Sequence, residues 1–324
     1  MRLTLARVLF AFGIVLLALA HPAGAEYPEQ PIRLVLQFAP GGETDPIARA
    51  LSQSVSKSIG QPIVIENRPG AAGNIAFDMV AKAPKDGYTL LWGFSTPMVV
   101  NPSMYKSLPF SVERDFVPIA MVAEGQFVLV VNPSVAAKSV KELIAYAKAN
   151  PGKLTYASTG VGSPLHLAGE LFMARTGIKL LHVPYKSGGD AARAVLAGET
   201  DLLFGSIAGS KPNIDAGKVR ALAVTGPKRL ALVPDLPTIE EAGLPGFVVT
   251  AWHSVLAPAG TPKPIVEKLR REFAKALTSA ELKDAMDKLG VLPAAATNET
   301  FFARVRDEEA MWRKVIQDAG IKPE

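Results

Sequence analysis

The sequence contains no cysteine among its 324 residues and only four histidines. Disulfide bonds, thiol catalysis and thiolate metal sites are therefore excluded, and the fold must depend on its hydrophobic core. Histidines and carboxylates do not cluster with the spacing of a metal site, so we expect no metal and no cofactor. The G-x-S-x-G, H-E-x-x-H and P-loop motifs are also absent, which leaves the common hydrolase, metalloprotease and nucleotide-binding signatures unmatched.

Charge of one sign is not concentrated anywhere in the chain. Lysine and arginine number 35 against 30 acidic residues, and the formal net charge is +5, to which Arg2 and Arg7 contribute two charges. No basic block is interleaved with aromatic residues, so the sequence gives no support for nucleic-acid binding. A mildly basic chain is compatible with a small anionic ligand.

An apolar run at residues 8–20 stands near the N-terminus, behind Arg2 and Arg7. It is shorter than the roughly 20 residues that span a bilayer, and Ala23-Gly24-Ala25 resembles a cleavage site. We therefore predict a signal peptide cleaved after Ala25, in preference to a membrane anchor or a helix of the folded domain. No later apolar run is long enough to cross a membrane, so we expect residues 26–324 to be exported and soluble.

Short β-rich runs alternate with helical stretches, which predicts an α/β fold with mostly parallel sheets. The first unit is expected to contain strands and helices in the order 32–38, 45–59, 62–66, 74–82 and 88–93. The same order recurs in a second unit at 154–158, from 163 onward, 178–183, 190–197 and 201–205. Two such units predict two lobes, each with glycine-rich loops at the carboxyl ends of its strands.

Two apolar segments are expected to connect the lobes, one at 127–131 and one at 247–252. They predict that lobe 1 comprises residues 26–127 and 248–324 and that lobe 2 comprises residues 128–247. Two crossings form a hinge, which allows the lobes to close on a ligand. Amphipathic helices are expected in the C-terminal part and should pack on lobe 1, at 264–276, 281–289 and 301–319.

The two glycine-rich turns lie where a strand leads into a helix. Gly41-Gly42 precedes Asp45-Pro46, and residues 160–162 precede Ser163-Pro164. A helix N-terminus presents unpaired N–H groups, and glycine lets an anion approach the backbone closely. Ligands of open α/β sheets bind at this end of the strands. We therefore predict that a small organic anion binds between the lobes.

Three side chains near these turns have two interpretations each. Asp45 and Ser163 precede a proline and are suited to cap a helix, although a ligand contact is also compatible with their position. His166 is equally compatible with a cleft contact and with an interior or surface role. His182 lies inside a predicted strand and is interpreted as structural.

The segments FAPGGETD at 38–45 and ENRPGAAGNI at 66–75 resemble the Bug-type (TctC-like) periplasmic receptors, the substrate-binding components of tripartite tricarboxylate transporters. The resemblance extends over essentially the whole mature chain through residues 86–91, 151–158, 182–186, 221–225, 257–262 and 319–322. It implies a two-lobed Venus-flytrap fold in the periplasm, with the ligand in the cleft between the lobes. Membrane permease subunits are the implied partners, and we expect a monomer.

The resemblance also implies that both lobes contact the ligand. On lobe 1 the implied residues are Phe38, Pro40, Gly41, Gly42, Thr44, Asp45, Gly93, Ser95 and Thr96. On lobe 2 they are Ser158, Thr159, Gly160, Ser163, His166, Phe204, Gly205 and Ser206. None of these residues is expected to be catalytic or to bind a metal.

Three functions are compatible with this pattern. The favoured one is a solute-binding protein, not an enzyme, that captures a dicarboxylate, a tricarboxylate or an aromatic acid and delivers it to a permease. A ligand-sensing adaptor for a membrane sensor kinase would share the same fold. A secreted serine hydrolase using Ser158 or Ser163 with His166 is disfavoured, because nothing in the sequence brings a nucleophile and a base together.

Overall fold

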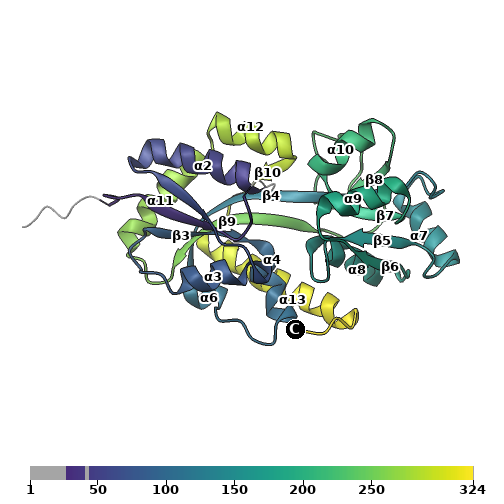
Figure 1. Ribbon diagram of the computed structural model, residues 1–324, viewed down its shortest axis with the longest axis horizontal. Helices are drawn as coiled ribbons and strands as arrows, with labels where there is room; N and C mark the ends of the chain where they lie inside the picture. The colour runs from purple at the N-terminus through teal and green to yellow at the C-terminus, as the bar shows by residue number, and fades with distance from the viewer. Residues whose placement is uncertain (1–26, 41–43, 324) are drawn as a thin grey trace, which may run out of the picture.

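The computed structural model describes residues 27–40 and 44–323. The predicted signal peptide with its cleavage site, and both glycines of the first predicted turn, lie outside these ranges. The described chain forms two lobes that lie side by side, each with a sheet covered by helices (Figure 1). Within these ranges no helix is both long enough and apolar enough to cross a bilayer.

Lobe 1 is built on a sheet with the strand order β2-β1-β3-β9-β4. The strands β1 (Ile32–Leu36), β2 (Ile63–Asn67) and β3 (Thr89–Phe94) are parallel. The strand β9 (Thr250–Pro258) runs antiparallel to both β3 and β4 (Phe116–Val131), and β10 (Val291–Pro293) pairs antiparallel with β4. Strands such as β1 and β3 are almost continuously apolar because helices cover both faces of the sheet.

The helices of lobe 1 form a layer on each face of this sheet (Figure 1). One layer contains α2 (Thr44–Ile59), α11 (Lys263–Ala276) and α12 (Ala280–Leu289), whose apolar faces share a core cluster with β1 and β3. The other contains α3 (Asn74–Ala81) and α13 (Asn298–Asp318). Short helices η1 (Ala71–Gly73), α4 (Ser95–Val99), α5 (Asn101–Met104) and α6 (Val112–Asp115) complete the lobe.

Lobe 2 has the strand order β4-β7-β5-β6, with β8 (Arg220–Val224) also paired to β4. The strands β5 (Thr155–Ser158), β6 (Leu181–Pro184) and β7 (Leu202–Ser206) are parallel, whereas β4 is antiparallel to β7. One face is covered by α9 (Gly188–Ala197) and α10 (Ile207–Asp215), and the other by α7 (Val140–Ala149) and α8 (Pro164–Thr176). The expected two-lobed α/β fold is thus confirmed.

The strand β4 passes from one lobe into the other without a break. It pairs with β9 up to Gln126 and with β7 from Phe127 onward. The predicted crossing at 127–131 is therefore the last five residues of a strand of 16 residues, and the predicted return segment at 247–252 runs into the start of β9. We propose that the lobes divide at the predicted positions, after residues 127 and 247.

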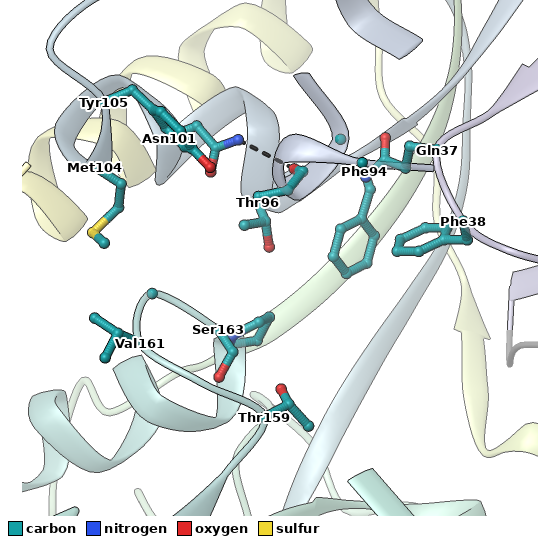
Figure 2. A pocket seen from close by; sticks show the side chains of 15 residues that line it. Gln37, Phe38, Phe94, Thr96, Asn101, Met104, Tyr105, Thr159, Val161 and Ser163 are labelled. Atoms are coloured by element: carbon teal, nitrogen blue, oxygen red, sulfur yellow. Dashed lines mark hydrogen bonds between the residues drawn. The ribbon is translucent and has the colours of Figure 1, made fainter. Parts of the chain in front are cut away.

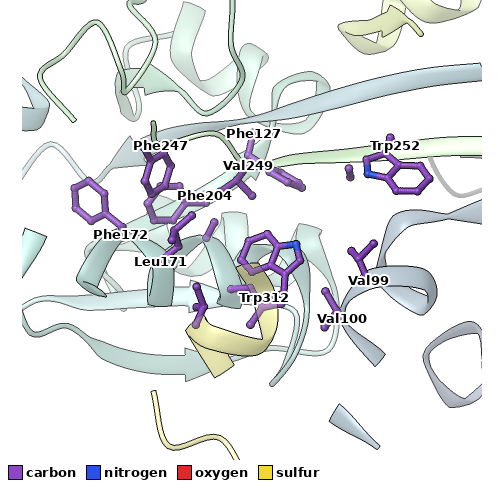
Figure 3. Packing of buried hydrophobic residues seen from close by; sticks show 14 of the residues in the cluster. Val99, Val100, Phe127, Leu171, Phe172, Phe204, Phe247, Val249, Trp252 and Trp312 are labelled. Atoms are coloured by element: carbon purple, nitrogen blue, oxygen red, sulfur yellow. The ribbon is translucent and has the colours of Figure 1, made fainter. Parts of the chain in front are cut away.

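The C-terminal helix α13 differs from expectation, because it contacts α8 of lobe 2 as well as α4 and α5 of lobe 1. Its apolar stripe includes Trp312, which lies in one core cluster with Val99 and Val100 on one side and Leu171 and Phe172 on the other (Figure 3). A helix of 21 residues is long enough to contact both lobes along its length. Apolar packing therefore joins the lobes in addition to the two strands.

Candidate ligand-binding cleft

A cavity of about 330 Å³ lies between the lobes and is lined by residues of both. Figure 2 shows side chains from the two sides pointing toward the same space. We call it the central cavity. Lobe 1 contributes residues after β1 and β2, residues at and after the end of β3, and α5, and lobe 2 contributes the loop between β5 and α8. The lining residues are Gln37, Phe38, Gly70, Ala72, Gly73, Phe94, Thr96, Asn101, Met104, Tyr105, Thr159, Val161, Gly162, Ser163 and Pro164.

One wall of the central cavity is aromatic. The rings of Phe38 and Phe94 meet edge to face, with their centroids 5.2 Å apart. The ring of Phe94 in turn lies against the ring of His253, with the two centroids 5.0 Å apart. The indole N–H of Trp92 donates a hydrogen bond to His253 Nδ1 at 3.1 Å. Burial lowers the pKa of His253 to about 4, so its ring is neutral at neutral pH. The wall is therefore a fixed, uncharged surface suited to the body of a ligand.

Two carboxamides bring polar groups to this cavity. Gln37 is 5% exposed, and its Oε1 has no hydrogen-bond partner among the described residues. Asn101 donates from Nδ2 to the Ala72 carbonyl at 3.2 Å and to Asn74 Oδ1 at 2.6 Å. The turn beside them needs a glycine, because Gly73 has φ 96° and a Cβ there would lie 3.0 Å from Gln37 Nε2.

The loop from β5 to α8 directs its backbone amides inward. The amide of Gly160 donates to Ser158 Oγ at 3.0 Å and that of Gly162 to His166 Nδ1 at 3.2 Å. The Ser163 amide bonds the Gly160 carbonyl, and Ser163 Oγ caps α8 by accepting from the His166 amide. These amides are therefore not available to an anion, contrary to expectation. What the loop offers to the cavity instead is the hydroxyl groups of Thr159 and Ser163.

A polar cluster lies behind this loop. Ser158 Oγ lies 2.5 Å from His182 Nε2, and the rings of His166 and His182 are 4.2 Å apart. The Tyr156 hydroxyl donates to Glu170 at 2.6 Å, and His166 Nε2 lies 3.5 Å from the same carboxylate oxygen. Burial lowers the pKa of His166 to about 4, with His182 adding to the effect, and burial raises the pKa of Glu170.

The contacts in this cluster indicate whether His166 and His182 have an interior role or face the cleft. His166 is an interior residue that holds the loop through Gly162, and His182 is structural as expected. Ser158 is fully buried, and Ser163 caps a helix rather than facing a base. The geometry gives the serine hydrolase hypothesis no support, because neither serine is both exposed to the cleft and paired with a histidine.

Four of the predicted ligand-binding residues line the central cavity: Phe38, Thr96, Thr159 and Ser163. Thr44 and Ser206 line a neighbouring cavity of about 320 Å³, which shares Phe38, Phe94 and Pro164 with the central one. Gly205 lines a third cavity of about 400 Å³ in lobe 2, together with Thr159 and Ser206. The structure therefore brings residues of both predicted walls to one cleft.

Other predicted residues lie elsewhere. Gly41 and Gly42 are outside the described residues, and Pro40 is in an exposed turn. The side chain of Asp45 neither caps α2 nor lines the central cavity, because the helix already begins at Thr44 and Arg49 holds the carboxylate at 2.8 and 3.2 Å. The remaining residues do not line the three cavities: Gly93, Ser95, Ser158, Gly160, His166 and Phe204.

The reason is packing in most of these cases. Phe204 is fully buried against Phe172 and Phe247 in the core of lobe 2, so its ring faces away from the cleft. Gly93 lies against β9, where a Cβ would be 2.5 Å from Ser254 Oγ. Sequence reasoning missed Gln37, Asn101, Met104 and Tyr105, which line the central cavity, whereas Val161 lies in the predicted turn at 160–162. Of these, only Gln37 gave a signal in the sequence, because it is a polar residue at the end of an apolar strand.

Comparison with known proteins identifies the group to which the chain belongs. Residues 47–321 match the family described as the tripartite tricarboxylate transporter family receptor. The chain belongs to this receptor family. The resemblance inferred from the sequence is thereby confirmed, and the family is one of solute-binding receptors. In the described part of this receptor, no group of three His, Asp or Glu side chains is placed to hold a metal ion.

Three relatives illustrate the similarity. The receptor is 37% identical to Protein BugT of Bordetella pertussis over 324 residues, which cover 99% of both chains. It is 37% identical to R. palustris Rpa4515, solved with adipate, with a TM-score of 0.79 over 92% of this chain and 100% of that one. It is 32% identical to MatC from Rhodopseudomonas palustris, solved with malate, with a TM-score of 0.75 over 90% and 100% of the two chains.

Proposed function

We propose that this receptor works in the periplasm, where it captures a small organic carboxylate in the central cavity and delivers it to a membrane permease. The observation that carries the proposal is the cavity itself, which is lined by hydroxyl groups from both lobes and by aromatic rings from lobe 1. Membership of the receptor family supports it, as do the relatives solved with adipate and with malate. We expect the receptor to act as a monomer.

A ligand that contacts both lobes should favour the closed form of the receptor. A ligand shifts an open–closed equilibrium only by its difference in affinity for the two forms. An acid that reaches Thr96 on lobe 1 and Thr159 and Ser163 on lobe 2 has its full set of partners only when the lobes are close. The closed, loaded form is then the one that a permease recognises.

The proposal is tested by thermal unfolding of residues 26–324 purified without ligand, in the presence of mono-, di- and tricarboxylates. A ligand that binds only the folded state raises the melting temperature in proportion to the logarithm of its concentration. We expect at least one acid to do so at micromolar to millimolar concentration, and the matching amide or ester to have no effect. A receptor whose melting temperature responds to no organic acid would contradict the proposed function.

A further inference from the structure

His253 of β9 has one ring nitrogen without a partner among the described residues. Its Nδ1 accepts from the Trp92 indole at 3.1 Å, so the hydrogen of the neutral ring is on Nε2. The two nitrogens point to nearly opposite sides of the imidazole, which directs the Nε2–H group away from Trp92. No described residue accepts a hydrogen bond from it. His253 therefore holds a donor that lacks an acceptor.

This donor opens onto the neighbouring cavity of about 320 Å³, which His253 lines. The His253 side chain is only 7% exposed, but its Nε2 is not fully enclosed by protein, unlike Gln37 Oε1. The bond from Trp92 and the contact with the Phe94 ring hold the imidazole in place. A nearly buried donor without an acceptor is unfavourable, and a bound molecule that supplies an acceptor would satisfy it.

The neighbouring cavity continues the central cavity. The two share Phe38, Phe94 and Pro164, so the aromatic wall borders both (Figure 2). An acid whose carboxylate accepts from Thr159 and Ser163 can extend along this wall and place its far end in the neighbouring cavity. The volumes of about 330 and 320 Å³ leave room for an acid with an extended body.

The lining of the neighbouring cavity indicates the chemistry of that far end. Its described lining residues carry no charge at neutral pH, because burial lowers the pKa of His253 to about 4. Most of them are apolar, among them Ile47, Phe127 and Leu165. A second carboxylate would be desolvated here without a cation to offset it. An uncharged carbonyl oxygen can accept from the neutral imidazole without that cost.

We propose that His253 is a ligand-binding residue of this receptor and that the ligand is an oxo acid. Its carboxylate lies in the central cavity, and an uncharged carbonyl at its far end accepts from His253 Nε2–H in the neighbouring cavity. A donor at this place favours such an acid over an acid of the same length that lacks the carbonyl. This inference rests on the proposed function, and it names the class of acid and the residue that selects it.

Isothermal titration calorimetry on ligand-free residues 26–324 tests this preference with matched acids. Pentanoate, hexanoate and heptanoate are compared with 4-oxopentanoate, 5-oxohexanoate and 6-oxoheptanoate, and adipate provides a charged far end. We expect at least one oxo acid to bind about five-fold more tightly than its unsubstituted partner, because it pairs the His253 donor. The same oxo acid should bind more tightly than adipate. His253→Phe keeps a ring and removes the donor, so the ratio of the two dissociation constants should fall to about one.

Nuclear magnetic resonance of the unmodified receptor labelled with ¹⁵N in histidine observes the donor directly. Residues 26–324 contain three histidines, and the His253 signals can be assigned through their proximity to the Trp92 indole. We expect the hydrogen on Nε2 in the free receptor. The Nε2–H proton resonance should move to higher frequency with the preferred oxo acid than with its unsubstituted partner.

Equal affinities within every pair, or tighter binding of adipate than of every oxo acid, would overturn the inference and leave the proposed function standing. Binding of another organic acid but of none in this set would do the same. An Nε2–H signal that is identical with both members of the preferred pair would also overturn it, whether or not the His253→Phe variant folds. A receptor that binds no organic acid at all would instead contradict the proposed function itself.

Discussion

Met104 of lobe 1 meets Gly162 of lobe 2 so closely that a Cβ atom on Gly162 would lie 2.9 Å from Met104 Cε. The two residues line the same cavity from opposite sides, and Gly162 has φ 76°. The absence of a side chain at position 162 therefore serves two purposes. It permits a left-handed backbone conformation, and it lets the lobes approach each other beside the ligand.

Replacing Gly162 by leucine should weaken ligand binding on the order of ten-fold, because the new side chain holds the lobes apart. The matched control is Gly177→Leu, where φ is 71° and nothing lies within 4 Å of the added Cβ. Both variants should lose about 1–2 kcal/mol of unfolding free energy through backbone strain, as measured in urea. Only the Gly162 variant should bind the acid more weakly. Similar affinities for both would show that Gly162 serves the backbone alone.

Replacing Thr159 by valine tests the hydroxyl groups of the second lobe. Valine keeps the shape of threonine and removes the hydroxyl, so the dissociation constant of the acid should rise about ten-fold or more. The control is Thr200→Val, because Thr200 is buried and its hydroxyl has no partner among the described residues. That variant should bind the acid normally. An unchanged dissociation constant in Thr159→Val would remove this hydroxyl from the site.

Arg304 of α13 should contribute more to the free energy of unfolding than Arg306 on the same helix. It binds both carboxylate oxygens of Glu124 on β4 at 2.8 and 3.1 Å, and Glu308 at 2.6 Å, while Glu308 also accepts from the Trp252 indole. Arg304→Met leaves two partly buried carboxylates unpaired and should cost about 3 kcal/mol in a urea titration.

Arg306 provides the comparison, because its pair with Glu113 is exposed. Arg306→Met should change the free energy of unfolding by no more than about 0.5 kcal/mol. Equal losses in the two variants would mean that the Arg304 cluster contributes no more than a surface ion pair.

The lowered pKa of His253 predicts how the free energy of unfolding depends on pH. Burial lowers its pKa from 6.5 to about 4, and its Nδ1 must stay unprotonated to accept from Trp92. The unfolded state therefore binds a proton at a higher pH than the folded state does. The contribution of the neutral His253 ring to the free energy of unfolding is complete above pH 6.5. It is lost as the pH falls toward 4, and the loss is at most roughly 3 kcal/mol.

The His253→Asn variant keeps an acceptor for the Trp92 indole and removes the titrating ring. Urea titrations at several values between pH 7 and pH 4.5 should show a shallower loss of stability in this variant than in the unmodified receptor. The pKa values of His166 and His182 are also lowered by burial, so part of the pH dependence should remain. Identical slopes for the two proteins would contradict the assignment.

The order of strands and helices was predictable from the sequence because each element has a local signal. Ser163-Pro164 begins α8 as expected, since the cap and the proline both act within one turn. The same logic was wrong for Asp45, because α2 begins one residue earlier and Arg49, one turn along, takes the carboxylate. The contact of α13 with both lobes was not predictable, because it depends on which distant residues pack against Trp312 and no local sequence pattern indicates them.

The candidate site was predictable only in part, for a related reason. Phe38, Thr96, Thr159 and Ser163 were identified through the resemblance to the receptor family. The rule that ligands bind at strand ends indicated the region but not these individual residues. The direction of each backbone amide was not predictable, because His166 and Ser158 take those of Gly162 and Gly160 through folded contacts. Asn101 acquires its role from Ala72 and Asn74, which the fold brings beside it.

The most direct measurement is a crystal structure of the receptor with the organic acid that binds most tightly. The account predicts that the acid occupies the central cavity, with a carboxylate oxygen about 3 Å from the hydroxyl of Thr159 or Ser163 and its body against Phe38 and Phe94. An acid bound outside this cavity, or one whose carboxylate contacts neither hydroxyl, would contradict it.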